Sequence, residues 1–194
     1  MTELYRCKWA QGHPLLQEYH DNEWGVPVHD DYKFFEYLIL DSFQAGLSWL
    51  TILKKRENFR KAFDNFDFTK IANYDEKKIL QLLEYDGIIK NRLKIEATIQ
   101  NAQAFIKIIE EFGSFDKYIW KFVNYQSIIN SFEVYSQIPA KTRESDSMSR
   151  DLKKRGFAFL GSTICYAFMQ ATGMVNDHEI HCFRYNTCIV EQEM

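Results

Sequence analysis

Hydrophobic residues recur at steps of three and four along most of the chain, the spacing that places them on one face of an α-helix. Segment 91–111 shows this most clearly, with a single apolar stripe made of Ile95, Ile99, Ala102, Ile106 and Ile109. Gly and Pro are scarce, 8 and 3 of 194 residues, which argues against an architecture rich in tight turns. The pattern therefore predicts a protein built almost entirely from helices.

Capping residues place the boundaries of these helices. The predicted helices cover about residues 30–46, 48–53, 58–65, 76–85, 91–111, 114–120, 145–155 and 162–172. Ser48 and Ser114 stand where an N-cap is expected, and Gly156 and Gly173 follow the last turns of the final two helices. The loops between them are four to ten residues long, so we expect an all-α fold. Residues 184–194 carry no such pattern, and we expect them to be disordered.

Segment 82–92 differs from an ordinary loop between helices. One helix ends, a tight turn with Gly87 follows, two isoleucines return inward, and the next helix begins at once. This pattern is typical of a helix-hairpin-helix, whose backbone N–H groups bind a phosphate without base preference. Lys90, Arg92 and Lys94 would add positive charge there. A plain pair of antiparallel helices without nucleic-acid contacts is the commoner meaning of such a pattern and stays open.

Length and composition restrict the class of protein. A chain of 194 residues with 46% hydrophobic residues suits one large domain or two lobes that share an interface. It contains no apolar run of about 18 residues and no apolar leader, so we expect a cytoplasmic protein without a membrane segment. The net charge of −3 excludes a uniformly basic nucleic-acid-binding protein, but it leaves room for a local basic face.

Cysteine and histidine pairs lie at both ends of the sequence. Cys7 and His20 are near the start, and His178 and Cys182 are near the end. Four such ligands from two distant segments can close one tetrahedral zinc site and hold the ends of the chain together. The spacing matches no zinc-finger pattern, so surface histidines and buried free thiols remain an alternative.

Aromatic residues and a carboxylate gather in two further segments. Tyr19 and Trp24 lie in segment 19–25, while Trp49 closes segment 44–49, with Asp41 one turn earlier. Singly, each aromatic side chain is more often part of a core than of a binding site. Together with a carboxylate they can enclose a flat, cationic ring, because the ring faces attract the charge and the carboxylate accepts from ring N–H groups. A nucleobase flipped out of DNA is such a ring.

Several longer motifs occur in one order along residues 7 to 182. They are Cys7-Lys8-Trp9, Tyr19-His20-Asp21-Asn22-Glu23-Trp24-Gly25-Val26-Pro27, Gln44-Ala45-Gly46-Leu47-Ser48-Trp49, Leu53-Lys54-Lys55-Arg56-Glu57, Asp86-Gly87-Ile88-Ile89, Lys153-Lys154-Arg155-Gly156-Phe157 and Asn176-Asp177-His178. In these motifs the sequence resembles the DNA-3-methyladenine glycosylase I family, the constitutive bacterial type within the helix-hairpin-helix glycosylase superfamily. The resemblance covers nearly the whole sequence.

The resemblance implies an all-α, two-lobed glycosylase fold that acts as a single catalytic unit. The terminal segments, about 1–40 and 160–185, would share one lobe, and the middle, about 45–150, would carry the hairpin at 82–92. One structural Zn²⁺ per chain would join the ends through the four ligands Cys7, His20, His178 and Cys182. We expect a cytoplasmic monomer that binds double-stranded DNA containing alkylated bases and contacts no membrane.

The resemblance also implies an activity, the excision of 3-methyladenine by hydrolysis of its N-glycosidic bond, with the free base as product. The base pocket would consist of Tyr19, Trp49 and the carboxylate of Asp41, with Trp9 as a further wall. Gly46 and Leu47 would probe the gap left by the flipped nucleotide. DNA contacts would come from Gly87, Lys90, Arg92, Lys153, Lys154 and Arg155. No lysine is identifiable as a Schiff-base nucleophile, so we expect no lyase activity.

One departure from the family pattern concerns this pocket. The best-known members carry Glu where this sequence has Asp41, which shortens the carboxylate's reach by about 1.5 Å, one C–C bond. Ser42 and Phe43 also differ from the small and polar residues often found there. A non-catalytic protein that binds alkylated DNA is therefore the first alternative. A zinc-dependent nucleotide hydrolase or deaminase and a structural zinc module for protein partners are the others.

Overall fold

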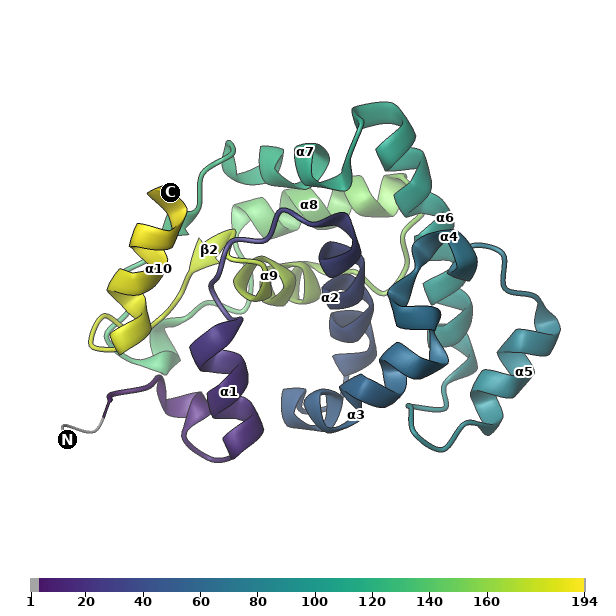
Figure 1. The fold of residues 1–194 in the computed structure, drawn as a ribbon. Coiled ribbons are helices and arrows are strands. Elements are labelled where there is room, and N and C mark those ends of the chain that lie inside the picture. Colours follow the sequence, from purple (N-terminus) through teal and green to yellow (C-terminus); the bar gives the residue numbers. More distant parts are fainter. Residues whose placement is uncertain (1–3, 194) are drawn as a thin grey trace.

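Helices make up most of residues 4–193, the part of the chain that this computed structural model describes (Figure 1). The α-helices are α1 (Pro14–Asn22), α2 (Asp31–Gln44), α3 (Trp49–Ala62), α4 (Phe68–Ile71), α5 (Glu76–Glu84), α6 (Arg92–Phe112), α7 (Phe115–Ile119), α8 (Arg143–Lys154), α9 (Ser162–Ala171) and α10 (Phe183–Glu193). Short 3₁₀ turns are η1 (Lys8–Ala10), η2 (Asp64–Phe66), η3 (Trp120–Val123) and η4 (Tyr135–Gln137). The mostly helical class predicted from the sequence is confirmed.

Side-chain caps start several helices where the sequence predicted them. The Asp30 carboxylate accepts a hydrogen bond from the backbone N–H of Lys33, 2.8 Å away, at the start of α2. The hydroxyls of Ser48 and Ser114 accept in the same way at the starts of α3 and α7. These bonds satisfy N–H groups that have no partner within the helix, which explains why the helices begin there.

Two predicted boundaries are wrong. The separate helices expected over 48–53 and 58–65 form the single helix α3, since no Gly or Pro interrupts the chain between them. The helix ends at Ala62, before three residues in the left-handed region, Asp64, Asn65 and Phe66. The helix predicted from residue 145 begins earlier, at Arg143, because Thr142 provides the cap.

Elements absent from the sequence prediction lie mainly near the chain ends. Residues 184–194 were expected to be disordered, yet α10 covers Phe183–Glu193, and its Cys188 side chain is fully buried. The short helices α1 and α4 were also missed. Strands β1 (Ile128–Ile129) and β2 (Val175–Asn176) pair in parallel with Ile128 opposite Val175, so the fold is not purely helical.

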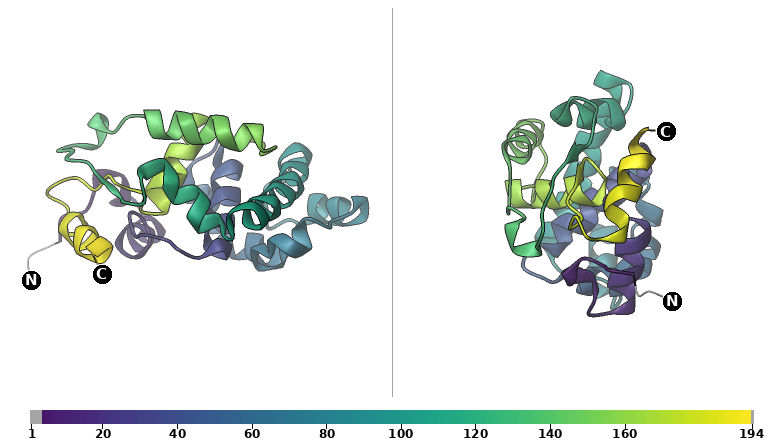
Figure 2. Two further views of the ribbon diagram at one scale, coloured as in Figure 1. Left: turned by 90° about the horizontal axis from the view of Figure 1, so that it is seen from above. Right: turned by 90° about the vertical axis from the view of Figure 1, so that its left-hand side faces the viewer.

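The helices are arranged around α2 and α9, which pack against each other in the interior (Figure 1). The chain ends, with α1 and α10, lie at one end of the molecule, and α4, α5 and α6 lie at the other, in Figure 1 and in the left-hand view of Figure 2. Much of the core is aromatic, with Phe34, Phe35, Phe43 and Phe105 fully buried. Within residues 4–193, no helix combines the length and the apolar character needed to cross a membrane.

Candidate functional site

A cavity of about 620 Å³ opens between α1, α2, α3, α9 and the segment 135–140. Its lining on the side of α1 to α3 and η1 includes Trp9, Tyr19, Trp24, Asp41, Gln44 and Trp49. These residues come from η1, α1, the turn after α1, α2 and α3, which the packing of α1 and α2 against α3 brings together. The structure thus places four of the predicted pocket residues, Trp9, Tyr19, Asp41 and Trp49, around one cavity.

The aromatic side chains form a corner. The rings of Tyr19 and Trp49 lie with centroids 5.2 Å apart and planes tilted by 54°. Trp9 stands against the other side of Tyr19, at 6.2 Å and 57°. Rings in this arrangement offer a flat ligand the face of one side chain and the edge of another. Burial in this cluster raises the pKa of Tyr19, so its hydroxyl stays protonated.

Asp41 is the carboxylate of this cavity. It lies in the last turn of α2, is 2% exposed, and its Oδ2 atom has no hydrogen-bond partner among the described residues. Burial raises the pKa of Asp41 well above its usual range, because the ionised form loses hydration without gaining a partner. A buried polar atom without a partner is costly, and such atoms are typical of sites that await a ligand.

Two indole groups share this property. The Nε1 atoms of Trp9 and Trp49 are buried and lack partners within the described part of the chain. The cavity walls therefore carry two unpartnered donors and one unpartnered acceptor. No Lys, Arg or His side chain occurs among the described residues that line the cavity. The site therefore suits a polar, flat ligand that is neutral or positively charged.

Other residues singled out in the sequence lie outside the cavity. Gly46 and Leu47 belong to the exposed loop 45–48 between α2 and α3, where Leu47 is 43% exposed. Ser42 and Phe43 face the core: the Ser42 hydroxyl donates to the Ile39 carbonyl oxygen at 2.7 Å, and the Phe43 ring packs against Phe59. Two of the three departures from the family pattern thus leave the cavity lining unchanged.

The cavity wall that faces Asp41 and the aromatic residues was not predicted from the sequence. Thr163, Tyr166, Ala167 and Gln170 of α9 line it. Their spacing of three and four places them on one helix face, a signal that the sequence did contain. Behind them, the buried Asp177 carboxylate accepts from the Tyr166 hydroxyl at 2.6 Å and from Gln170 Nε2 at 2.8 Å. Segment 135–140, which completes this wall, carries no comparable local signal.

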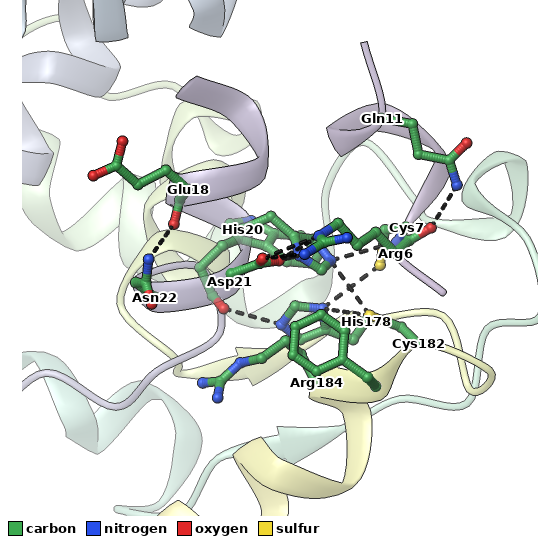
Figure 3. A network of polar contacts seen from close by, with 12 residues as sticks. Arg6, Cys7, Gln11, Glu18, His20, Asp21, Asn22, His178, Cys182 and Arg184 are labelled. Carbon is green, nitrogen blue, oxygen red and sulfur yellow. Dashed lines mark hydrogen bonds and ion pairs between the residues drawn. The ribbon is translucent and has the colours of Figure 1, made fainter. Parts of the chain in front are cut away.

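A second cluster joins the two ends of the chain. The side chains of Cys7, His20, His178 and Cys182 are buried, and their ligand atoms all lie within 4.8 Å of one another. Figure 3 shows them converging from the first and last segments of the chain. Cys7 Sγ is 3.5 Å from His178 Nδ1, and Cys182 Sγ is 3.4 Å from His20 Nε2. All four predicted ligands therefore meet at one point.

This geometry fits a tetrahedral ion. Zinc bonds of about 2.3 Å to sulfur and about 2.0 Å to nitrogen separate the two ligand atoms by about 3.5 Å. The second nitrogen of each ring is also engaged, His20 Nδ1 with Asp21 at 2.8 Å and His178 Nε2 with the Trp24 carbonyl at 3.0 Å. Such contacts fix the ring orientations, as they do around protein-bound metals. Gly25 permits the close packing, since a Cβ there would lie 3.0 Å from His178 Nε2.

The thiols of this cluster are electrostatically coupled. Their mutual hydrogen bond lowers the pKa of Cys182, with further lowering by the two imidazole rings, and raises that of Cys7. A thiolate is the form that binds a metal ion. The donor set, the burial and the spacing therefore all suit a closed zinc site.

The turn between α5 and α6 has the compact form predicted for segment 82–92. Ile88 is buried, and Gly87 packs so closely on α3 that a Cβ would lie 2.7 Å from Asn58 Cβ. Lys90 pairs with Asp86, and Arg92 pairs with two carboxylates. Tight packing alone accounts for the glycine, and both basic groups already have partners on the same surface.

The basic run at the end of α8 divides into two kinds of residue. Lys153 and Lys154 are exposed, and no ion pair within residues 4–193 includes them. Arg155 is held by Glu111, 2.6 Å away, and by Asp151, 3.1 Å away. The predicted basic face therefore consists of two available lysines beside an arginine that is part of the local structure.

Comparison with known proteins connects these sites to a family. Residues 9–185 match the sequence model of the family described as methyladenine glycosylase. The chain is 48% identical, over 182 residues, to DNA-3-methyladenine glycosylase 1 of Escherichia coli strain K12, which covers 94% of this chain and 97% of that protein.

Solved structures are similar over most of the chain. A crystal structure of a 3-methyladenine DNA glycosylase I has a TM-score of 0.90 and 49% sequence identity, covering 92% of this chain and 98% of the other. A single-residue variant of a 3-methyladenine DNA glycosylase I, crystallised in complex with 3-methyladenine, has a TM-score of 0.89 and 35% identity, covering 92% and 96%. The family match, residues 9–185, contains all the residues that line the cavity and three members of the Cys/His cluster, His20, His178 and Cys182.

Proposed function

The chain belongs to the methyladenine glycosylase family, and from this premise we propose that it excises 3-methyladenine from alkylated DNA. One observation carries the proposal: the cavity holds a buried carboxylate oxygen and two buried indole N–H groups without partners, and no cationic side chain lines it within the described residues. A methylated adenine in DNA carries a positive charge and a weakened glycosidic bond. Such a base supplies the partner that Asp41 lacks and meets no like charge in the cavity.

Each lining group has a proposed task. The Asp41 carboxylate accepts a hydrogen bond from the adenine edge, and the charge of the base favours the ionised form of Asp41. The ring of the base stacks on Tyr19 or Trp49, contacts that contribute on the order of 1–3 kcal/mol each. Trp9 closes the pocket behind Tyr19. These contacts hold the base outside the duplex.

The reaction then needs little acid catalysis. The bond between the sugar C1′ and the base nitrogen breaks, the electron pair stays with the base, and the base becomes neutral. Water adds to C1′ and loses a proton to solvent. We assign Asp41 a role in recognition, because its negative charge attracts the cationic base, and a role in the reaction, because the same charge stabilises the positive charge that passes to the sugar C1′ as the bond breaks. No lysine lies among the described lining residues, which supports hydrolysis without a lyase step.

The Cys/His cluster is proposed to hold one structural Zn²⁺. Four protein ligands fill a tetrahedral site, so no position remains for an activated water, and the ion would contribute stability only. Tyr5, which donates to Glu179 at 2.6 Å, adds a further contact between the two chain ends. This supports a single catalytic unit in which the segments of about 1–40 and 160–185 form one lobe and about 45–150 the other.

DNA contacts are proposed on two surfaces. The turn between α5 and α6, interpreted as a helix-hairpin-helix, would offer backbone N–H groups to a phosphate, and Lys90 and Arg92 would exchange their carboxylate partners for phosphates. Lys153 and Lys154 would bind the backbone directly. Leu47, on the exposed loop after α2, is proposed to enter the gap left by the flipped nucleotide. We propose that the enzyme acts as a monomer, so the residue that fills this gap comes from one of its own loops.

A base-release assay tests the function. Purified protein is incubated with methylated DNA, and free 3-methyladenine and 7-methylguanine are resolved and quantified. We expect release of 3-methyladenine, and a single-turnover rate at least about tenfold lower for Asp41→Asn, because one charge-assisted contact is removed. The matched control, Glu110→Gln, removes an exposed carboxylate of α6 and should retain the wild-type rate.

The same assay distinguishes the alternative of a non-catalytic binding protein. That alternative drew on Asp41, Ser42 and Phe43, but the latter two belong to the core. Absence of base release by folded wild-type protein, combined with binding to methylated DNA, would overturn the proposed excision. Equal rates for wild type and Asp41→Asn would overturn the role given to Asp41.

A further inference from the structure

Lys94 is a buried lysine in the first turn of α6. It is 7% exposed, and its Nζ atom donates to the carbonyl oxygens of Phe43 and Ala45, each 2.9 Å away. No ion pair found within residues 4–193 includes it, and burial lowers its pKa. Lysine is almost never this buried unless a carboxylate pairs with it, so two backbone carbonyls are an unusual set of partners.

These carbonyls belong to the C-terminal end of α2. The last carbonyls of a helix lack partners within it and carry partial negative charge, which a cation stabilises. The carbonyl between these two, that of Gln44, accepts from Leu47 N–H at 2.6 Å. Lys94 therefore fixes the last residues of α2, which follow Asp41, at the point where the helix leads directly into loop 45–48.

The backbone of Lys94 belongs to a different surface. Its N–H donates to the side-chain oxygen of Asn91 at 3.1 Å, and Asn91 is the N-cap of α6 and the last residue of the turn after α5. Ile88, which is buried, anchors the same turn in the core. A single residue thus bonds to the turn proposed to hold the DNA backbone and to the helix end that precedes Leu47.

We propose that Lys94 is a positioning residue that couples the turn between α5 and α6 to loop 45–48, so that Leu47 enters the gap when the turn holds the DNA backbone. The proposal rests on the function proposed above. Without the two hydrogen bonds, the end of α2 would lose its anchor and loop 45–48 would no longer be held relative to the turn. Base recognition inside the cavity would continue, because Lys94 does not line it and Asp41 precedes the two residues that Lys94 holds, inside helix α2.

This role predicts a dependence on base pairing. A loop that fills the gap stabilises the flipped state, and flipping costs most for a base that is paired and stacked. Loss of the coupling should therefore slow excision of a paired lesion. It should matter much less for a lesion that faces no partner, which needs less help to leave the helix. A residue that merely supported the fold would affect both substrates equally.

The experiment compares two chemically methylated duplexes, each with a single adenine, placed opposite thymine or opposite an abasic position. Lys94→Met keeps the length of the side chain but removes its donors. We expect its single-turnover release of 3-methyladenine to fall about tenfold on the paired duplex, the effect of losing hydrogen bonds from one charged group. On the unpaired duplex we expect a change of less than about threefold. Lys107→Met, on the exposed side of α6, is the matched control and should match wild type on both.

Two further measurements separate coupling from a loss of structure. Binding of free 3-methyladenine, followed by the fluorescence of the tryptophans that line the cavity, should be unchanged in Lys94→Met. Leu47→Ala should show the same preference for the unpaired duplex. The double variant should be no slower than the slower single variant, because both changes interrupt one chain of contacts.

Equal losses on both duplexes, additive effects of the two substitutions, or weakened binding of the free base would each overturn the coupling. If Lys94→Met does not fold, Lys94→Arg replaces it, since Arg keeps a charged donor and should retain the wild-type ratio between the duplexes. A changed ratio in that variant would count against the proposal. Wild-type protein that binds the free base but releases none from either duplex would instead overturn the proposed excision, and the inference with it.

Discussion

At the scale of single residues, Asp41 shows a conflict between stability and binding. Its carboxylate is buried, and one oxygen has no partner among the described residues. Leaving a buried polar group unpaired costs about 1–3 kcal/mol. The folded protein tolerates this cost because the same unpaired oxygen is the proposed acceptor for the base. The conflict has a measurable pH dependence.

The first prediction concerns the stability of Asp41→Asn. The raised pKa of Asp41 means that the folded protein retains a proton that the unfolded chain releases near pH 4. The stability from protonated Asp41 is fully present below about pH 4 and is lost as the pH rises through the raised pKa. Asn carries no such loss, so its Tm should exceed that of wild type by a few degrees at pH 7.

Thermal unfolding of both proteins between pH 4 and pH 8 checks this prediction. The difference in Tm should shrink as the pH approaches 4, where wild-type Asp41 is protonated and resembles Asn. A difference that is constant across this range would mean that Asp41 does not titrate inside the folded protein. A lower Tm for Asp41→Asn at pH 7 would mean that the carboxylate has a stabilising partner.

Residues of the candidate site differ in how far the sequence could reveal them. Tyr19 and Trp49 were predicted together because they belong to long motifs, and Asp41 because it lies one turn before one of them; all three do line one cavity. Lys94 was seen only as one more basic residue near the turn. Its hydrogen bonds to the end of α2 connect residues about fifty positions apart, and the local sequence carries no trace of such a contact.

At the scale of elements, the end of α8 separates two roles for basic residues. Lys153 and Lys154 are exposed and without ion pairs in the described range, whereas Arg155 binds Glu111 and Asp151. Arg155 also covers the ring of Phe112, 5.0 Å away. The three residues are adjacent in the sequence, yet they should respond differently to substitution.

The second prediction uses the salt dependence of DNA binding. Replacing both Lys153 and Lys154 with Ala should weaken binding to duplexes of any sequence and reduce the slope of log affinity against log salt by about 0.9 for each phosphate that is no longer neutralised. Arg155→Ala should instead lower the Tm and leave the slope nearly unchanged, because its charge is already paired. Fluorescence anisotropy at several salt concentrations measures both slopes. Unchanged slopes for the double variant would remove these lysines from the DNA-binding surface.

Element boundaries were predictable where a local signal sets them. Asp30, Ser48 and Ser114 do cap helices, and a cap acts within a few residues of its own position. α10 was missed because the sequence beyond residue 183 carries no apolar stripe. Its order comes from contacts with distant segments, such as the hydrogen bond from Phe183 N–H to the Tyr5 carbonyl.

At the scale of the whole molecule, the Cys/His cluster connects segments about 170 residues apart, as between Cys7 and His178. The proposed ion stabilises only the folded state, in which all four ligands meet, so its binding free energy adds to the free energy of unfolding. The cavity lies close by. Tyr19, which lines it, directly precedes the proposed ligand His20. Trp24, which also lines it, directly precedes Gly25, and Gly25 packs against His178.

The third prediction concerns this ion. His178→Ala should abolish binding of stoichiometric zinc and lower the Tm by about ten degrees or more, on the order expected from losing several kcal/mol of metal binding. His181→Ala changes an exposed histidine three residues away and should retain both zinc and Tm. Elemental analysis and calorimetry provide the two readings. Full zinc content in His178→Ala would contradict the proposed ligand set.

The whole-molecule arrangement was only partly within reach of the sequence. The four proposed ligands could be named because the Cys and His residues gather mainly at the two ends of the sequence and because the family resemblance implies these four. The wall formed by segment 135–140 and α9 was not, because its residues become neighbours of Asp41 only after α2 and α9 have packed together. Tertiary packing, which no local pattern encodes, creates that half of the cavity.

The absence of Lys, Arg and His from the described cavity lining also affects what happens after the bond breaks. The bound base arrives with a positive charge and leaves without one, because it keeps the electron pair of the broken bond. In the proposed reaction, Asp41 therefore attracts the substrate more strongly than the product, and burial again favours the protonated form of Asp41 once the charge has gone. The proposed excision thus weakens the electrostatic attraction between the cavity and the base, which favours release of the product.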